Sequence, residues 1–357
     1  MDIQEQPVAD SSVWQGADLH GDRSWEYHLT DVHRQELDEA LQTVNRNSWV
    51  LPEITRERFP LPQLASRLNG VGAQLQSGRG FALLHGFPVD GYAYADLEKM
   101  YWGLCSHIGI GVTQNSEAGF IHYVTDGTLR PNQGTRGVGL PKETVLHVDL
   151  SDVASLLCAR QAPDDPPSRV ASSTTTYNEI LRRRPDLLPR LYAGFEWDRM
   201  GEHDAAESAT SGYRVPLFSA TNGFVSCQYN RHWIASANER NQSPLLKQDI
   251  EALDLIDEIA RATCFEFPFH QGDIQFCNNY TVMHGRAAHE VVVEEERKRV
   301  LLRIWMNTPG FRQFSDEAII RHGIGCHGRL GWSAPEVLAG MNQAPRQRRA
   351  DGAVSLA

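Results

Sequence analysis

The chain has 357 residues, of which 41% are hydrophobic and 22% charged, and its formal net charge at pH 7 is −11. This composition is typical of a globular protein whose core is large enough to fold without a disulfide or a structural metal. The acidic balance argues against nucleic acid as the main partner, and no apolar run of about 18 residues is present to span a membrane.

The cysteines and the N-terminal sequence indicate the compartment. Six cysteines occur, and none forms a C-x-x-C pair, which argues against a zinc ribbon or a thioredoxin-like motif. The first residues are polar and acidic and lack the apolar core of a signal peptide. We therefore expect reduced thiols in a cytoplasmic protein, and the sequence leaves a homo-oligomer open.

The N-terminal part of the chain is expected to form an arm and a helix over residues 1–60. Scattered aromatic residues without clear periodicity precede a stretch of good helix formers at 31–46. Within that stretch Leu37, Leu41 and Val44 recur at helical spacing, which predicts an amphipathic helix.

The rest of the chain alternates between helical and strand-like patterns. Helices are predicted at 61–75, 92–105, 174–183, 185–193 and 243–262. Strands are predicted at 81–84, 120–125, 154–159, 170–173, 215–218, 224–229, 265–269, 274–277 and 299–306. The turn dipeptide Asn222-Gly223 predicts a hairpin between 215–218 and 224–229. Many short strands with flanking helices favour a mainly β fold, a double-sheet jelly-roll core wrapped by helices.

Two segments are expected to stand apart from this core. Residues 126–146 contain a stretch rich in glycine, proline and polar residues, so they are a candidate lid loop. Residues 343–357 have little to bury and are expected to be disordered. Since no convincing boundary interrupts the remainder, residues 1–342 are interpreted as a single domain.

Three residues form a candidate metal site. His147 and Asp149 are two apart in a strand-like stretch, so their side chains point to the same side. A third donor, His284, follows a strand and a polar turn much later in the chain. Two imidazoles and one carboxylate on one face of a metal are the arrangement of non-haem Fe(II) oxygenases.

Two arginines follow the last histidine of this set. Arg299 and Arg303 are four apart in a predicted strand and therefore share a face. Two guanidinium groups pointing into a β core are costly unless anions meet them. A dicarboxylate cofactor is a natural partner, because guanidinium binds carboxylate in a bidentate manner.

The order of these motifs resembles a known family. The sequence H-x-D, then Gly272-Asp-Ile-Gln-Phe-Cys-Asn-Asn-Tyr-Thr-Val-Met-His-Gly-Arg, then R-x-x-x-R is similar to the taurine dioxygenase-like (TauD/TfdA-like) Fe(II)/2-oxoglutarate oxygenases of the clavaminate synthase-like superfamily. The likeness runs from about Gly80 to Asn307. It implies a jelly-roll core and a dioxygenase that uses O2 to oxidise a C–H bond of a small molecule, releasing succinate and CO2.

The resemblance also implies roles for single residues. His147, Asp149 and His284 would hold Fe(II) and act as the catalytic centre. Arg299 matches the arginine that pairs with the far carboxylate of 2-oxoglutarate, and Arg303 a second arginine for the cofactor or an anionic substrate group. A hydroxyl beside the first arginine falls here on Ser168, although Pro-Pro-Ser replaces the usual Gly-Gly-Thr of the family.

The substrate pocket is less well marked. Gln114 and Asn115 lie in the polar segment before the candidate lid, where relatives line the substrate site. Asn278 and Asn279 are interpreted mainly as caps of the turn before His284. The resemblance favours an amino acid or a secondary-metabolite intermediate as substrate. Because the carboxylate ligand is retained, hydroxylation, desaturation or epoxidation is favoured over halogenation.

Other interpretations remain open at this point. Two histidines and a carboxylate also suit a zinc hydrolase, but no general-base glutamate stands out and the two arginines would be unexplained. A non-catalytic β-barrel binding protein or a protein-modifying oxygenase is a further alternative. His322 and His327 flank Cys326 in a glycine-rich segment, which is interpreted as a surface loop rather than a second metal site.

Overall fold

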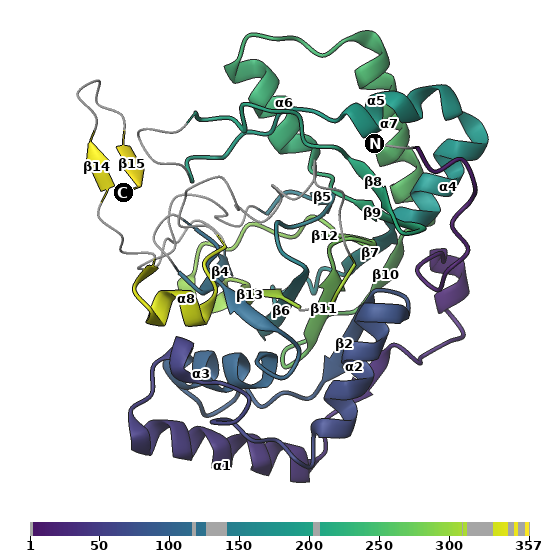
Figure 1. Cartoon of the computed structure of the whole chain (residues 1–357). Helices are drawn as coiled ribbons and strands as arrows, with labels where there is room; N and C mark the ends of the chain where they lie inside the picture. Colours follow the sequence, from purple (N-terminus) through teal and green to yellow (C-terminus); the bar gives the residue numbers. More distant parts are fainter. Residues whose placement is uncertain are drawn as a thin grey trace.

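The computed structural model describes residues 3–115, 119–125, 141–202, 208–308, 310–312 and 331–341, with strands at 346–348 and 354–356. Two β-sheets form its centre, and helices cover them from both sides (Figure 1). A layer of buried apolar residues contributed by both sheets lies between them. This is the predicted jelly-roll core with flanking helices.

The larger sheet has seven strands in the order β1-β2-β11-β6-β13-β3, and β4 also pairs with β13. These strands are β1 (Glu26–His28), β2 (Phe81–His85), β3 (Ile110–Val112), β4 (Ile121–Thr125), β6 (Val153–Arg160), β11 (Ile274–Asn278) and β13 (Val300–Asn307). Along β13 the side chains alternate: Leu302 and Ile304 pack toward the helices, whereas Leu301 packs between the sheets. Arg303 and Trp305 share the face of Leu301 and so point between the sheets.

The smaller sheet has four strands in the order β10-β7-β12-β5, all antiparallel. They are β5 (Thr144–His147), β7 (Ser168–Ser172), β10 (Phe265–Phe267) and β12 (Val282–Arg286). Val170 of β7 and Val282 of β12 belong to the same buried cluster as Phe81 and Leu301 of the larger sheet. In the β12–β5 pair, His284 lies directly opposite His147, which brings two residues of the candidate site together.

Amphipathic helices cover the outer faces of both sheets. On the larger sheet lie α1 (Asp31–Asn47), α2 (Ala65–Ser77) and α3 (Tyr94–Cys105), and on the smaller sheet α4 (Ser173–Arg183), α5 (Leu188–Ala193) and α7 (Lys247–Thr263). As predicted, α1 buries Leu37, Leu41 and Val44. The 3-10 turns are η1 (Gly16–Leu19), η2 (Leu51–Glu53), η3 (Pro185–Leu187) and η4 (Glu295–Arg297).

Two helices were not expected from the sequence, and one hairpin was. The sequence pattern did not indicate α6 (Arg231–Arg240), which buries only Ile234 and Ala237, or α8 (Ala334–Leu338), which is five residues long and buries only Ala334. The hairpin of β8 (Phe218–Thr221) and β9 (Phe224–Cys227) is confirmed. Its turn residues Asn222 and Gly223 both have positive φ, 53° and 80°, as a two-residue turn requires.

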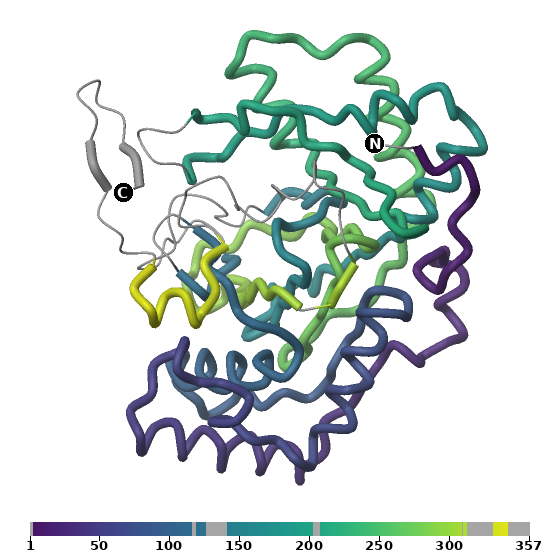
Figure 2. Tube along the Cα trace, viewed as in Figure 1, coloured from purple at the N-terminus to yellow at the C-terminus, as the bar shows by residue number. Residues whose placement is uncertain are grey.

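The N-terminal arm lies along the outside of the molecule. It runs from the side of α4 and α5 past the sheets to α1 (Figures 1 and 2). The Asn178 side chain makes hydrogen bonds of 2.8 Å with both backbone groups of Val8, and the Trp14 N–H donates to the Thr175 hydroxyl. These contacts join the arm to α4.

The predicted lid and the predicted disordered tail are only partly described. Of the candidate lid, 126–140 lie outside the described residues, and its last residues, 144–146, belong to β5 rather than to a loop. Within the tail 343–357, β14 (Arg346–Arg348) and β15 (Val354–Leu356) pair with each other. His322, Cys326 and His327 lie outside the described residues.

Candidate metal centre

Three side chains from two strands and the segment after β5 converge between the sheets. His147 ends β5 and His284 lies opposite it on β12. Beyond β5 the backbone leaves the strand pairing, and the Val148 N–H donates instead to the Tyr229 carbonyl at 2.9 Å. The next N–H, that of Asp149, donates to Asn279 Oδ1 at 3.0 Å. These two contacts place the Asp149 carboxylate beside both imidazoles.

The distances within this group suit one metal ion. His147 Nε2 lies 3.9 Å from Asp149 Oδ1, and His284 Nε2 lies 3.6 Å from Asp149 Oδ2. The two ring centroids are 4.7 Å apart, and one donor atom from each residue lies within 4.8 Å of the others. The set could therefore hold a metal ion, as the sequence motif predicts.

The hydrogen bonding of His147 fits the role of a metal ligand. Its Nδ1 lies 2.8 Å from the Val145 carbonyl, which can only accept, so Nδ1 carries the proton. The lone pair is then on Nε2, the nitrogen nearest Asp149. A backbone carbonyl that fixes the tautomer of a ligating histidine in this way is common at metal sites.

Asp149 is buried among cationic and hydrogen-bonding groups. Trp305 Nε1–H donates to Asp149 Oδ2 at 2.8 Å, and Arg303 Nη1 lies 3.4 and 3.3 Å from the two carboxylate oxygens. Burial alone would raise the pKa of this carboxyl, but Arg303 together with His284 and His147 holds that pKa well below its usual range. The carboxylate is thus ionised and ready for a cation.

The same burial keeps His147 neutral. Removal from water and the neighbouring His284 ring lower the pKa of His147 to about 4, against the opposing attraction of Asp149. A neutral imidazole is the form that binds a metal. At neutral pH, protons therefore compete only weakly with a metal ion for His147.

Gln114 holds Arg303 in place. Its Oε1 accepts from Arg303 Nε at 2.8 Å, and its Nε2 donates to the carbonyls of Arg303 and Phe120 at 2.7 Å each. The guanidinium also stacks 4.7 Å from the centroid of the Trp305 ring. Asn115, the second predicted pocket residue, accepts from the Gly119 N–H at 3.0 Å. Gln114 therefore contacts the metal centre through Arg303.

The two remaining predicted cofactor residues lie in the same space between the sheets. Arg299 is buried, and its Nε donates to Gln161 Oε1 at 2.8 Å. It lies four positions before Arg303, which corresponds to about 13 Å along a strand. Ser168 is also buried, and its hydroxyl donates to the Gln275 side chain. In the pairing of β7 with β12 it lies opposite Arg286, which is two residues beyond His284.

Several residues that support the site were not predicted. Trp305 donates to Asp149, and the only sequence feature that could have indicated this role is its spacing of two from Arg303, which places both on one face of a strand. Asn279 was interpreted as a turn cap. Asn278 does accept from the Tyr280 N–H across that turn at 2.8 Å, but Asn279 reaches the Asp149 segment instead. Nothing in the local pattern indicates Gln161.

The sequence matches one protein family over most of its length. The family described as "Taurine catabolism dioxygenase TauD, TfdA family" matches residues 47–305. The chain belongs to this family. FR-33289 synthase of Streptomyces rubellomurinus is 30% identical over 321 residues, which cover 88% of this chain and 94% of that protein. The taurine hydroxylase-like protein SAT17 of Stachybotrys chartarum is 25% identical, with coverage of 86% and 84%.

Solved structures show the same fold at low sequence identity. An asparagine oxygenase in complex with Fe(II), 2S,3S-3-hydroxyasparagine and succinate superimposes with a TM-score of 0.62 at 15% identity, covering 80% of this chain and 94% of that one. The non-haem iron oxygenase OrfP with Fe and α-ketoglutaric acid gives a TM-score of 0.58 at 14% identity, with coverage of 79% and 94%.

Membership of the family sets the class of chemistry. The chain is an Fe(II)/2-oxoglutarate-dependent dioxygenase, and its cofactors are iron and 2-oxoglutarate, with O2 as oxidant. Within the described part of the chain, no helix is both long and apolar enough to cross a membrane.

Proposed function

We propose that His147, Asp149 and His284 are the iron ligands of this dioxygenase and that Arg299 anchors its 2-oxoglutarate. The convergence of the three donor atoms within 4.8 Å, in a buried place between the sheets, is the observation that carries the proposal. The donor set also suits the metal, because two imidazoles and a carboxylate on one face leave the opposite positions for cofactor and O2.

The surroundings of the triad support this assignment. Asp149 is ionised and held by Trp305 and Asn279, and His147 presents its Nε2 because its Nδ1 is bonded to a carbonyl. Ligands that are fixed before the metal arrives lose little freedom on binding it. The protein thereby orients the metal without needing to rearrange its strands.

Arg299 suits the far carboxylate of the cofactor. Arg299 is buried immediately before β13, four positions before Arg303, and a guanidinium binds a carboxylate in a bidentate manner. Ser168 offers a hydroxyl in the same layer for the same carboxylate. When bound, iron and 2-oxoglutarate would react with O2, of which one oxygen atom enters succinate as CO2 is released and the other is available to oxidise a C–H bond.

The substrate proposed is a small molecule with an anionic group, such as an amino acid or an amino-acid-derived metabolite, and the reaction is hydroxylation. Solved relatives of the same fold are complexes with hydroxyasparagine and with hydroxyarginine. Arg303 Nη1 lies 3.3 Å from Asp149 Oδ2, and its guanidinium can meet a substrate carboxylate while Gln114 holds its Nε. Gln114 and Asn115 remain the proposed lining of the substrate side.

Succinate release tests the proposed reaction. The iron-loaded enzyme, 2-oxoglutarate and O2 are combined with a panel of amino acids and their N-acylated derivatives. The expected result is a substrate that stimulates succinate release and gains one oxygen atom, seen by mass spectrometry. A substrate that loses two hydrogens instead would identify a desaturase. A panel in which only uncharged compounds are oxidised would contradict the anionic substrate.

The role of Arg299 has its own test. Replacing Arg299→Gln removes charge-assisted hydrogen bonds worth about 1.5–3 kcal/mol, so the 2-oxoglutarate concentration for half-saturation should rise about 10-fold to 100-fold. Arg297→Gln is the matched control, because Arg297 lies nearby on η4 but is largely exposed and pairs with Glu294. Equal 2-oxoglutarate affinity of both variants would remove the assignment.

A further inference from the structure

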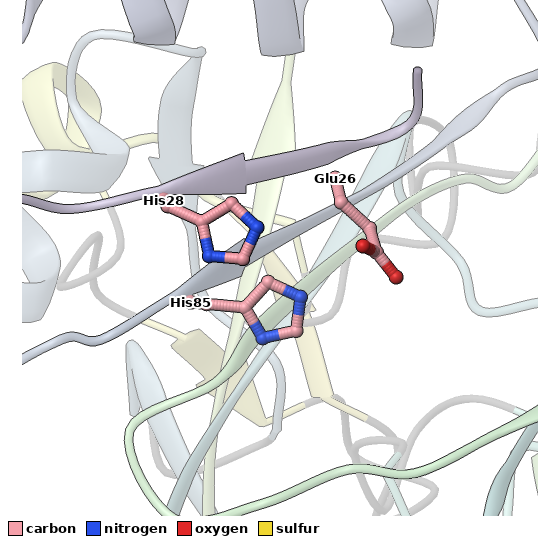
Figure 3. Close-up of side chains that lie close together, drawn as sticks. All are labelled: Glu26, His28 and His85. Carbon is pink, nitrogen blue, oxygen red and sulfur yellow. The ribbon is translucent and has the colours of Figure 1, made fainter. Parts of the chain in front are cut away.

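A second group of metal-ligating side chains lies at the edge of the larger sheet, away from the triad. It consists of Glu26 and His28 on β1 and His85 at the end of β2 (Figure 3). The parallel pairing of these strands places His28 directly opposite His85. Glu26 is two residues before His28 and so projects from the same face of β1. The strand register alone therefore brings three potential ligands together.

The geometry of this cluster is that of a cation site. The two imidazole rings are stacked with centroids 4.7 Å apart and an angle of 17° between their planes. The Glu26 carboxylate lies beside both rings, on the side toward which a nitrogen of each ring points (Figure 3). One donor atom from each of the three residues lies within 4.8 Å of the other two. The two imidazole rings of the triad also have centroids 4.7 Å apart, at a larger angle of 47° between their planes.

His85 is oriented by a buried carboxylate. Its Nδ1 lies 2.7 Å from Asp273 Oδ1, and the other oxygen of Asp273 accepts from the His270 N–H at 2.8 Å. A carboxylate oxygen accepts a hydrogen bond from Nδ1–H, so the lone pair of His85 lies on Nε2. Carboxylates that hold a ligating histidine in this way are a regular part of metal sites and raise the basicity of the ligand.

The charge balance also favours a cation. The Glu26 side chain is only 7% exposed, and it forms an ion pair at 3.0 Å with Arg23, whose side chain is 69% exposed. Such a surface arginine can move away from the carboxylate at little cost. Glu26 and Asp273 together bring two negative charges to the two imidazoles, which a divalent ion balances.

We propose that Glu26, His28 and His85 form a second metal site, separate from the iron triad, that takes a divalent ion such as Zn²⁺. Two imidazoles and one carboxylate are a common zinc ligand set, with water completing the coordination. The bound ion joins the short edge strand β1 to β2 and, through Asp273, to the turn that leads into β11. It thereby anchors the N-terminal arm to the core, and it does not depend on the function proposed for the triad.

Zinc binding can be tested with the triad disabled. In full-length Asp149→Ala protein, prepared with chelator and then dialysed against Zn²⁺, we expect one ion per chain and a zinc-dependent rise in Tm. Asp149→Ala/His28→Ala should bind none and show no rise. The control Asp149→Ala/His232→Ala removes an exposed histidine of α6 and should behave like Asp149→Ala.

Two further variants test the roles of Asp273 and Glu26 in zinc binding. Asp273→Asn, in the same background, keeps the three ligands and should weaken zinc affinity about 10-fold to 100-fold. Glu26→Gln should also weaken it, and its Tm measured in chelator reports whether the chain is folded. The proposal is overturned if Asp149→Ala binds no zinc, or if zinc affinity is the same with and without His28.

Discussion

Removal of the Trp305 indole N–H should weaken iron binding without opening the core. Trp305 is 1% exposed and donates to Asp149 Oδ2 at 2.8 Å. In Trp305→Phe the aromatic ring remains to pack and to stack under Arg303, but the carboxylate loses a donor. A hydrogen bond to a charged group contributes about 1.5–3 kcal/mol. Since about 1.4 kcal/mol is tenfold in affinity, iron affinity should fall about 10-fold to 100-fold.

The matched control is the same substitution elsewhere in the core. Trp102 is 3% exposed, and its Nε1–H donates to the neutral Ile54 carbonyl at 3.1 Å rather than to a carboxylate. Trp102→Phe should reduce the free energy of unfolding by about 0.5–1.5 kcal/mol and leave iron affinity unchanged. Anaerobic equilibrium dialysis with Fe(II) measures both variants. Equal iron affinity of Trp305→Phe, Trp102→Phe and the parent enzyme would refute the reasoning.

Three further predictions follow from the site and its surroundings. Burial lowers the pKa of His147 to about 4, so between pH 6.5 and about 4 the unfolded metal-free chain binds more protons than the folded one. The free energy of unfolding should therefore fall on acidification through that range, by at most about 3 kcal/mol. Denaturant titrations of His147→Gln should show a weaker pH dependence. Burial raises the pKa of Cys158 and of Cys277 to about 12, so iodoacetamide at pH 8 should leave both unlabelled in the folded enzyme, and rapid labelling would show that the space between the sheets is open. A Cβ at Gly285 would lie 2.4 Å from the Thr144 carbonyl, so Gly285→Ala should push β5 from β12 and weaken iron binding, whereas Gly72→Ala in α2, with nothing within 4 Å, should not.

The sequence was most informative where the spacing of residues along one strand or helix determines which side chains share a face. The spacing of two between His147 and Asp149 and of four between Arg299 and Arg303 predicted shared faces. The apolar spacing of Leu37, Leu41 and Val44 predicted α1, and this is confirmed. These patterns are local, so a single chain carries enough information to interpret them.

Contacts between distant segments could not be found in this way. Gln114 and Arg303 are 189 residues apart, and their hydrogen bonds exist only because β3 and β4 both pair with β13. The same holds for Asn279, which reaches Asp149 from the far end of a turn. α6 was missed for another reason, because its stability depends on an Asn230 cap and on only two buried residues rather than on a full apolar stripe.

An anaerobic titration with Fe(II) and 2-oxoglutarate tests the proposed ligand set most directly. The parent enzyme should develop the weak visible metal-to-ligand charge-transfer band of a chelated 2-oxoacid, saturating at one iron per triad. His284→Ala should lose the band at the same metal concentration, while His232→Ala, an exposed histidine on α6, should retain it. A band of full intensity in His284→Ala, or none in the parent enzyme, would contradict the assignment of these three residues to iron.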